Sequence, residues 1–149
     1  MSKIFVTRQI PESGLAMLRE KGFELTVSSH DRVLTKEEII AGLKNGYDVM
    51  LCLLTDKIDA EVMDAGLPTL KMIANYAVGF DNIDLKAAAG RNLIVTNTPG
   101  VLTETVAEHT FALLLSIAHR IPESDRFTRA GKYVGWGPML LLGTDVSGK

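Results

Sequence analysis

The chain has 149 residues, of which 46% are hydrophobic and 23% are charged, and its formal net charge is -2. This composition supplies a hydrophobic core, and the length predicts one domain or one domain with part of a second. The balanced charge, without runs of like sign, argues against nucleic-acid binding and against a polybasic membrane anchor. The single cysteine, Cys52, excludes a disulfide framework and a cysteine-rich zinc site. Its apolar sequence neighbours predict a buried side chain rather than a nucleophile.

Targeting and membrane-spanning signals are not apparent in the sequence. The apolar stretch near the amino terminus is too short for a signal-peptide core, and Arg8 ends it. The longest apolar stretch, residues 111–118, falls far short of the ~20 residues that span a bilayer. We therefore expect a soluble protein of a reducing compartment, most simply the cytoplasm, with no membrane partner.

Short β-rich runs alternate with helical patterns over the first hundred residues. Thr35 and Glu38 have the spacing of a capping box, and Asp59 and Asp84 are placed as N-caps of two later helices. The alternation implies right-handed βαβ crossovers and predicts an α/β fold, with a flavodoxin-like parallel five-stranded sheet flanked by helices. The predicted strands cover residues 3–7, 24–28, 47–53, 70–74 and 93–96.

The pattern changes after residue 100. Thr105 and Glu108 have capping-box spacing, and the helix that they open is expected to run to about Arg120, ahead of Pro122. This helix is apolar over about two thirds of its circumference, so it must be covered on more than one side. A shorter amphipathic segment and a glycine-rich loop are expected after it.

Two domains are expected from this change of pattern. Residues 1–100 form the α/β domain. Residues 101–149 form a hinge, the long helix and a loop.

The segment from Asn75 to Asp84 follows the fourth predicted strand, so it lies at the carboxyl edge of the sheet. Open α/β folds bind ligands at that edge. Gly79 is expected to let the backbone turn so that consecutive amides point at one anion. The same residues also fit an ordinary strand-to-helix turn, and the pattern leaves both interpretations open. Residues 97–100 form a turn, or a hinge if a second domain follows.

Other candidate sites are weaker. The segment Gly135-Trp136-Gly137-Pro138 imitates the start of a dinucleotide fingerprint, but no predicted strand precedes it and no helix follows it, so we expect no phosphate-cradling loop. The three histidines are expected at surfaces or interfaces rather than in a catalytic or metal site; they are His30, His109 and His119.

Two long motifs at fixed spacing resemble the D-isomer-specific 2-hydroxyacid dehydrogenases, and among them the glyoxylate/hydroxypyruvate reductases. The motifs are ANYAVGFDNID at residues 74–84 and IVTNTPGVLTETVAEH at residues 94–109. The resemblance covers nearly the whole chain. It implies a substrate-binding domain in residues 1–100, followed by the start of a domain that binds NAD or NADP.

The resemblance also implies roles for four residues. Val78 and Gly79 present backbone amides to the substrate carboxylate, and Leu54 lies on the substrate side of the cleft. Val106, together with Val78, contacts the nicotinamide end of the cofactor. The helix 106–120 packs across a homodimer interface, which accounts for its wide apolar face.

The family's fingerprint glycines and its catalytic arginine, glutamate and histidine come after Lys149. We therefore expect no catalytic residue in this chain, which corresponds to about the first half of such an enzyme and is expected to be inactive alone. The resemblance implies that the complete enzyme acts on the CH–OH group of a D-2-hydroxy acid, in the direction that reduces a 2-oxo acid such as glyoxylate or hydroxypyruvate. The sequence decides neither the hydroxy acid nor between NAD and NADP.

Three other interpretations compete with this one. A phospho-receiver needs an acidic pair after the first strand, where this chain has Val6-Thr7-Arg8. A flavin-binding flavodoxin needs a phosphate cradle after that strand, which Arg8-Gln9-Ile10-Pro11 does not resemble. A non-catalytic dimeric interaction or regulatory module derived from the same fold stays open.

Overall fold

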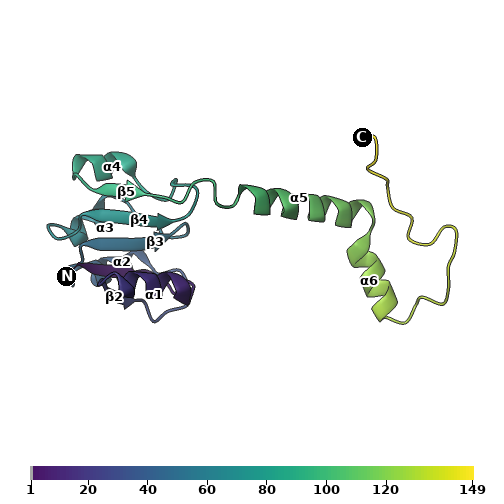
Figure 1. The fold of residues 1–149 in the computed structure, drawn as a ribbon, viewed down its shortest axis with the longest axis horizontal. Coiled ribbons are helices and arrows are strands. Elements are labelled where there is room, and N and C mark those ends of the chain that lie inside the picture. Colours follow the sequence, from purple (N-terminus) through teal and green to yellow (C-terminus); the bar gives the residue numbers. More distant parts are fainter. Residues whose placement is uncertain (1) are drawn as a thin grey trace. The chain divides into compact units, whose positions relative to one another are not determined.

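A computed structural model describes residues 2–149, which form two compact units divided between Val101 and Leu102 (Figure 1). The first unit contains β1 (Lys3–Val6), α1 (Glu12–Glu20), β2 (Glu24–Val27), α2 (Lys36–Leu43), β3 (Val49–Leu53), α3 (Ala60–Gly66), β4 (Met72–Tyr76), α4 (Leu85–Gly90) and β5 (Ile94–Thr96). The second unit contains α5 (Thr103–Ala118), α6 (Ile121–Arg129) and a terminal segment without helix or strand, as predicted.

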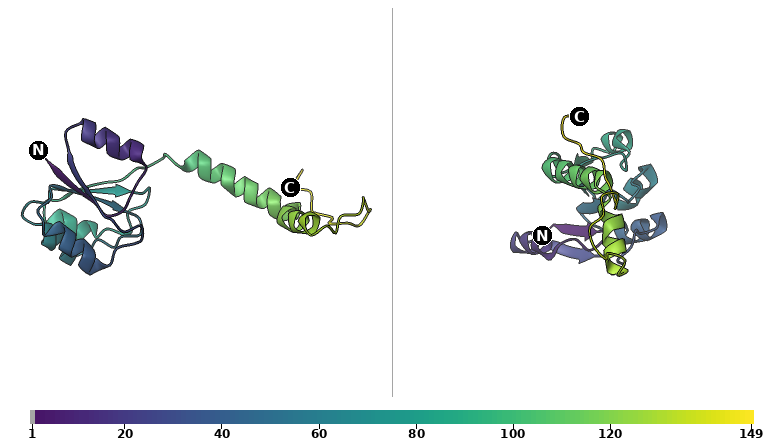
Figure 2. Two further views of the ribbon diagram at one scale, coloured as in Figure 1. Left: turned by 90° about the horizontal axis from the view of Figure 1, so that it is seen from below. Right: turned by 90° about the vertical axis from the view of Figure 1, so that its right-hand side faces the viewer.

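The five strands form one parallel sheet in the order β2-β1-β3-β4-β5. Helix α1 covers one face of this sheet, and α2, α3 and α4 cover the other face (Figure 2). The strand order reverses between β1 and β3, as it does in flavodoxin-like folds. The predicted α/β fold with a five-stranded parallel sheet is confirmed.

The hydrophobic core is unequal on the two faces of the sheet. The larger cluster lies between the sheet and helices α2–α4, and it includes the fully buried Met50, Met63 and Ile73. The smaller cluster packs α1 against β1 through Leu15 and Val6. Strand β3, predicted to be buried on both faces, is instead fully buried only on alternate residues. The reason is that α1 alone covers its second face.

The predicted helix caps in the first unit are confirmed. The Thr35 hydroxyl accepts a hydrogen bond from the Glu38 amide, and the Glu38 carboxylate accepts one from the Thr35 amide. Asp59 and Asp84 cap α3 and α4 in the same way, through the amides of the third residue of each helix.

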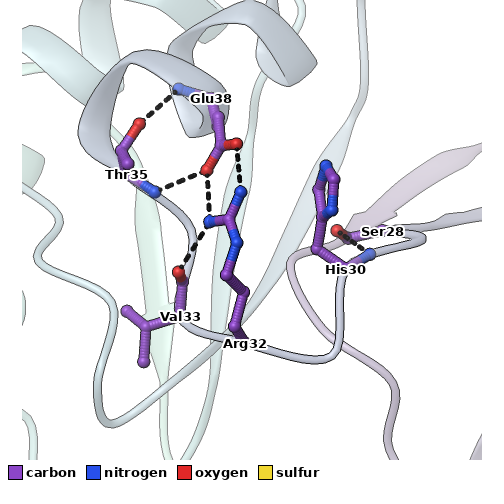
Figure 3. Close-up of polar contacts among 6 residues, drawn as sticks. All are labelled: Ser28, His30, Arg32, Val33, Thr35 and Glu38. Carbon is purple, nitrogen blue, oxygen red and sulfur yellow. Dashed lines mark hydrogen bonds and ion pairs between the residues drawn. The ribbon is translucent and has the colours of Figure 1, made fainter.

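The α2 cap also anchors the loop that follows β2. The Arg32 guanidinium forms two hydrogen bonds to the Glu38 carboxylate, at 2.6 and 2.8 Å (Figure 3). This ion pair and the Thr35 amide lower the pKa of Glu38 to about 2. The two charges therefore compensate each other at neutral pH.

The capping box predicted at Thr105 and Glu108 is wrong. Helix α5 begins at Thr103, and its N-cap Leu102 makes no side-chain capping bond. Leu102 already has right-handed helical backbone angles, and its carbonyl accepts from the amide of Val106 at 2.8 Å. Thr105 therefore lies inside the helix, where its hydroxyl cannot cap the first turn.

Helix α5 ends ahead of Pro122, as predicted, at a break formed by Arg120 in the left-handed region (φ 53°). The terminal segment packs against this break. The Thr144 amide donates to the carbonyl of Ala118 at 2.7 Å, and Arg120 donates to the carbonyl of Leu142. A Cβ atom on Gly143 would lie 2.5 Å from the Ala118 oxygen, so this contact requires glycine. No helix that the structure describes is long and apolar enough to cross a bilayer.

Candidate substrate-carboxylate site

Strands β3, β4 and β5 end at the same edge of the sheet (Figure 1). Leu53 of β3 pairs with Tyr76 of β4, so the residues that follow them, Leu54 and the 77–80 loop, leave the sheet side by side. The Leu54 side chain is 65% exposed. Three of the predicted site residues, Leu54, Val78 and Gly79, are therefore brought together at the edge where parallel sheets bind ligands.

Hydrogen bonds hold four consecutive carbonyl groups of the 77–80 loop. The Ala77 oxygen accepts from the Thr98 amide at 2.9 Å, and the Val78 oxygen accepts from Nδ2 of Asn97 at 2.8 Å. The Gly79 oxygen accepts from Nδ2 of Asn75 at 2.9 Å, and the Phe80 oxygen accepts from the Ile83 amide at 3.0 Å.

Three of the four amides of the same loop are left open. Within residues 2–149, the N–H groups of Val78, Gly79 and Phe80 donate to no protein acceptor. Because a trans peptide holds its N–H opposite its C=O, a bound carbonyl on one side leaves a fixed donor on the other. Consecutive open amides are a known arrangement for binding an anion. The loop can therefore accept a carboxylate without reorganising its backbone.

A pair of carboxamides lies beneath this loop. Nδ2 of Asn75 donates to Oδ1 of Asn82 at 3.0 Å, and Nδ2 of Asn82 donates to Oδ1 of Asn75 at 3.2 Å. Nδ2 of Asn82 also lies 3.1 Å from the carbonyl oxygens of Leu53 and Asp56. Asn75 is almost fully buried, and the pair thus ties the end of β3 to the 77–80 loop.

A buried carboxylate completes the support on the β1 side. Oδ2 of Asp56 accepts from the Thr7 hydroxyl at 2.5 Å and from the Leu53 amide at 2.9 Å. Burial, together with the charge of Asp56, raises the pKa of Cys52 to about 12. Cys52 is fully buried, as predicted, and it stays protonated at neutral pH.

The prediction that the turn itself needs a glycine at position 79 is wrong. The φ of Gly79 lies outside the left-handed region, and a Cβ atom there would meet only Oδ2 of Asp81, at 3.9 Å. The turn therefore accepts other residues. Close approach of a ligand is the remaining reason for glycine at this position.

A small hollow of about 120 Å³ lies beside the loop. Phe80 of the 77–80 loop and Asn97 line it, together with Leu85, Val95 and Thr96. Arg8 and Arg32, which follow β1 and β2, are paired with Asp31 and Glu38. The open amides of the loop are donors that an anion can use without either arginine.

The remaining predicted residues lie elsewhere. Val106 is in α5, in the second unit, and is 58% exposed. The Gly135–Pro138 segment follows no strand, in agreement with the rejected fingerprint. His30, which lies beside the Arg32–Glu38 pair in Figure 3, and the other two histidines are exposed. No group of side chains suited to a metal ion occurs among residues 2–149.

Sequence reasoning missed the roles of Asn75, Asn82 and Asn97. All three lie inside the two motifs, where the pattern gives them no separate role. For Asn75 and Asn97 the available signal was a carboxamide at the end of a strand or directly after one, because such a group must find partners when it is buried. Asn82 lies in a loop and gives no such signal.

Comparison with known proteins identifies the family. Residues 4–135 match the family model described as D-isomer specific 2-hydroxyacid dehydrogenase, catalytic domain. A glyoxylate reductase from Korarchaeum cryptofilum is 51% identical over 148 residues, which cover 99% of this chain and 44% of the relative. The chain thus spans less than half the length of that relative.

Two crystal structures share the fold. The TT0316 protein from Thermus thermophilus is 44% identical, with a TM-score of 0.89 over 96% of this chain and 45% of that protein. A D-isomer specific 2-hydroxyacid dehydrogenase, NAD-binding, from Polaromonas sp. JS6 66 is 37% identical, with a TM-score of 0.88 over 99% of this chain and 46% of that protein. This chain belongs to the family of D-isomer specific 2-hydroxyacid dehydrogenases.

Proposed function

We propose that the first unit is the substrate-binding domain of an NAD(P)-dependent dehydrogenase, and that the amides of Val78 and Gly79 bind the carboxylate of a 2-oxo or 2-hydroxy acid. One observation carries the proposal: the carbonyls of this loop are all held within the protein, whereas the amides of Val78, Gly79 and Phe80 have no acceptor among residues 2–149. Hydrogen bonds to a charged acceptor are stronger than those between neutral groups, so two such amides suffice to select a carboxylate.

The substrate class is proposed from the apolar neighbour of the amides and from the names of relatives. Leu54 lies on the neighbouring strand end and offers an exposed apolar side chain beside the amides. Such a neighbour suits a small acid with few polar substituents. Because several relatives carry the name glyoxylate reductase, we propose glyoxylate or hydroxypyruvate as the 2-oxo acid.

For the nucleotide, we propose that Val78 and Val106 contact the nicotinamide end of NAD or NADP. Within residues 2–149, no glycine-rich turn joins a strand to a helix in the way that a dinucleotide phosphate requires. The described chain therefore does not fit the whole cofactor. We further propose that residues 1–149 alone do not catalyse turnover, since within residues 2–149 no histidine or arginine forms a hydrogen bond to the 77–80 loop.

The exposed face of α5 supports the proposed homodimer through residues 106–120. Phe111 is 65% exposed and Ile117 is 76% exposed, and further leucines lie between them. Contiguous apolar surface of this kind marks an interaction site, and a two-fold dimer is the commonest way to cover it. The same observation favours the second candidate function, a non-catalytic dimeric interaction module. Neither proposal includes a nucleic-acid or membrane partner, and a cytoplasmic location stays the expectation.

Leu114→Asp combined with Ile117→Asp tests the dimer. Light scattering at micromolar concentration should show a dimer for the unmodified chain and a monomer, or insoluble protein, for the variant. A well-behaved monomer of the unmodified chain contradicts the dimer.

The carboxylate site is tested by calorimetry with glycolate and with glycolamide, which replaces the carboxylate by a neutral amide. We expect glycolate to bind and glycolamide not to bind. Gly79→Val should lower the affinity for glycolate at least about tenfold, because the valine side chain fills the space through which the ligand reaches the amides. Gly90→Val is the matched control, since a Cβ at Gly90 meets nothing within 4 Å. Equal binding of both probes would contradict the proposal.

A further inference from the structure

Asn97 and Thr98, the two residues that follow β5, form hydrogen bonds to the 77–80 loop. The Thr98 amide donates to the Ala77 carbonyl at 2.9 Å, and Nδ2 of Asn97 donates to the Val78 carbonyl at 2.8 Å. Both contacts join segments about twenty residues apart in the chain. They differ in kind, because the first is a main-chain bond and the second depends on one side chain.

Each of these bonds sets the direction of a different amide. The C=O of Ala77 and the N–H of Val78 belong to one peptide plane, and the C=O of Val78 and the N–H of Gly79 belong to the next. Thr98 therefore orients the Val78 amide, and Asn97 orients the Gly79 amide. Since both carbonyls are held by residues 97–98, both amides turn away from that segment.

The Asn97 side chain is itself held in place. It is half-buried and lines the hollow of about 120 Å³ together with Phe80 and Leu85. A carboxamide is needed here because the partner is a carbonyl oxygen, which requires a donor. Aspartate has nearly the same shape but, when ionised, only acceptors.

We propose that Asn97 is a positioning residue that orients the Gly79 amide toward the substrate carboxylate without touching the substrate. The inference rests on the proposed carboxylate site. When the carboxamide is removed, the peptide between Val78 and Gly79 becomes free to rotate. The Val78 amide keeps its direction through Thr98. The two amides should therefore respond differently to the loss of one side chain.

The test uses the ¹⁵N-labelled 149-residue chain, titrated with sodium glycolate and followed by the amide signals of Val78 and Gly79. The variants are Asn97→Ala and Asn97→Asp. The control is Asn45→Ala, which removes a carboxamide that donates to carbonyls at the end of α2. We expect both Asn97 variants to lower the affinity for glycolate about fivefold to tenfold, which corresponds to the loss of one oriented hydrogen bond. The glycolate-induced change in chemical shift should become smaller for the Gly79 amide and persist for the Val78 amide. In the Asn45→Ala control, both changes and the affinity should equal those of the unmodified chain.

The possible failures are distinguishable. If glycolate shifts neither amide signal in the unmodified chain, the proposed carboxylate site is wrong, and so is the inference about Asn97. If glycolate binds and the Asn97 variants bind it equally, with an unchanged Gly79 shift, only the inference is wrong. The bond is also measurable without a variant, as a scalar coupling between Nδ2 of Asn97 and the Val78 carbonyl carbon. Absence of that coupling in the folded chain overturns the inference.

Discussion

Replacing Asn75 by leucine tests whether the buried carboxamide pair supports the loop. Leucine has the same branched arrangement of heavy atoms but no polar atoms, so Asn75→Leu removes the donor to the Gly79 carbonyl and the donor to Oδ1 of Asn82. Two acceptors then lose their partner in or near the interior, each at a cost of about 1–2 kcal/mol. Nδ2 of Asn82 keeps its other carbonyl partners. We expect a loss of about 2–4 kcal/mol in the free energy of unfolding of the first unit.

The assay must report on the first unit, and the only tryptophan, Trp136, lies in the second. Amide hydrogen exchange of Met50 and Ile73, in the centre of the sheet, reports the opening of the first unit directly. Asn45→Leu serves as control, because that carboxamide is exposed and bonds only the end of α2. A change of less than about 0.5 kcal/mol in Asn75→Leu, or an equal change in the control, would refute the reasoning.

Three further predictions concern charge, packing and pH. Asp81→Asn removes an exposed carboxylate beside the loop, so calorimetry should show glycolate binding up to about fourfold tighter at low salt, and no gain contradicts the anion site. Gly143→Ala places a Cβ atom 2.5 Å from the Ala118 carbonyl, so limited proteolysis should cut the terminal segment faster than in the unmodified chain; equal rates contradict the packing described. Because Arg32 lowers the pKa of Glu38 to about 2, this pair stabilises the fold above pH ~4.5 and loses its effect as the pH falls toward 2. Glu38→Gln should therefore flatten the fall of the melting temperature over that range, and an unchanged acid profile contradicts it.

Local signals in the sequence predicted the fold well. The alternation of strands and helices, and the caps at Thr35, Asp59 and Asp84, depend on residues within a few positions of each other. Chain-local chemistry is enough to place such features. The capping box predicted at Thr105 was wrong because the chain already enters the helix at Leu102. The local pattern alone cannot show where the helix begins.

The support of the site could not be predicted in the same way. Asn97 and Val78 are 19 positions apart, and Asn82 and Leu53 are 29 positions apart, so these contacts exist only after the sheet has formed. The motifs indicated which loop faces the ligand edge. Only the fold shows which side chains hold its carbonyls, and that the φ of Gly79 does not require glycine.

The central claim is that the open amides of Val78 and Gly79 bind a carboxylate, and a crystal structure of this chain grown with glycolate tests it most directly. We predict electron density for the acid at the end of β4, with its carboxylate oxygens about 2.7–3.1 Å from the two amide nitrogens. Density for glycolate at another place, or an empty loop at a glycolate concentration that saturates binding in solution, would contradict the claim.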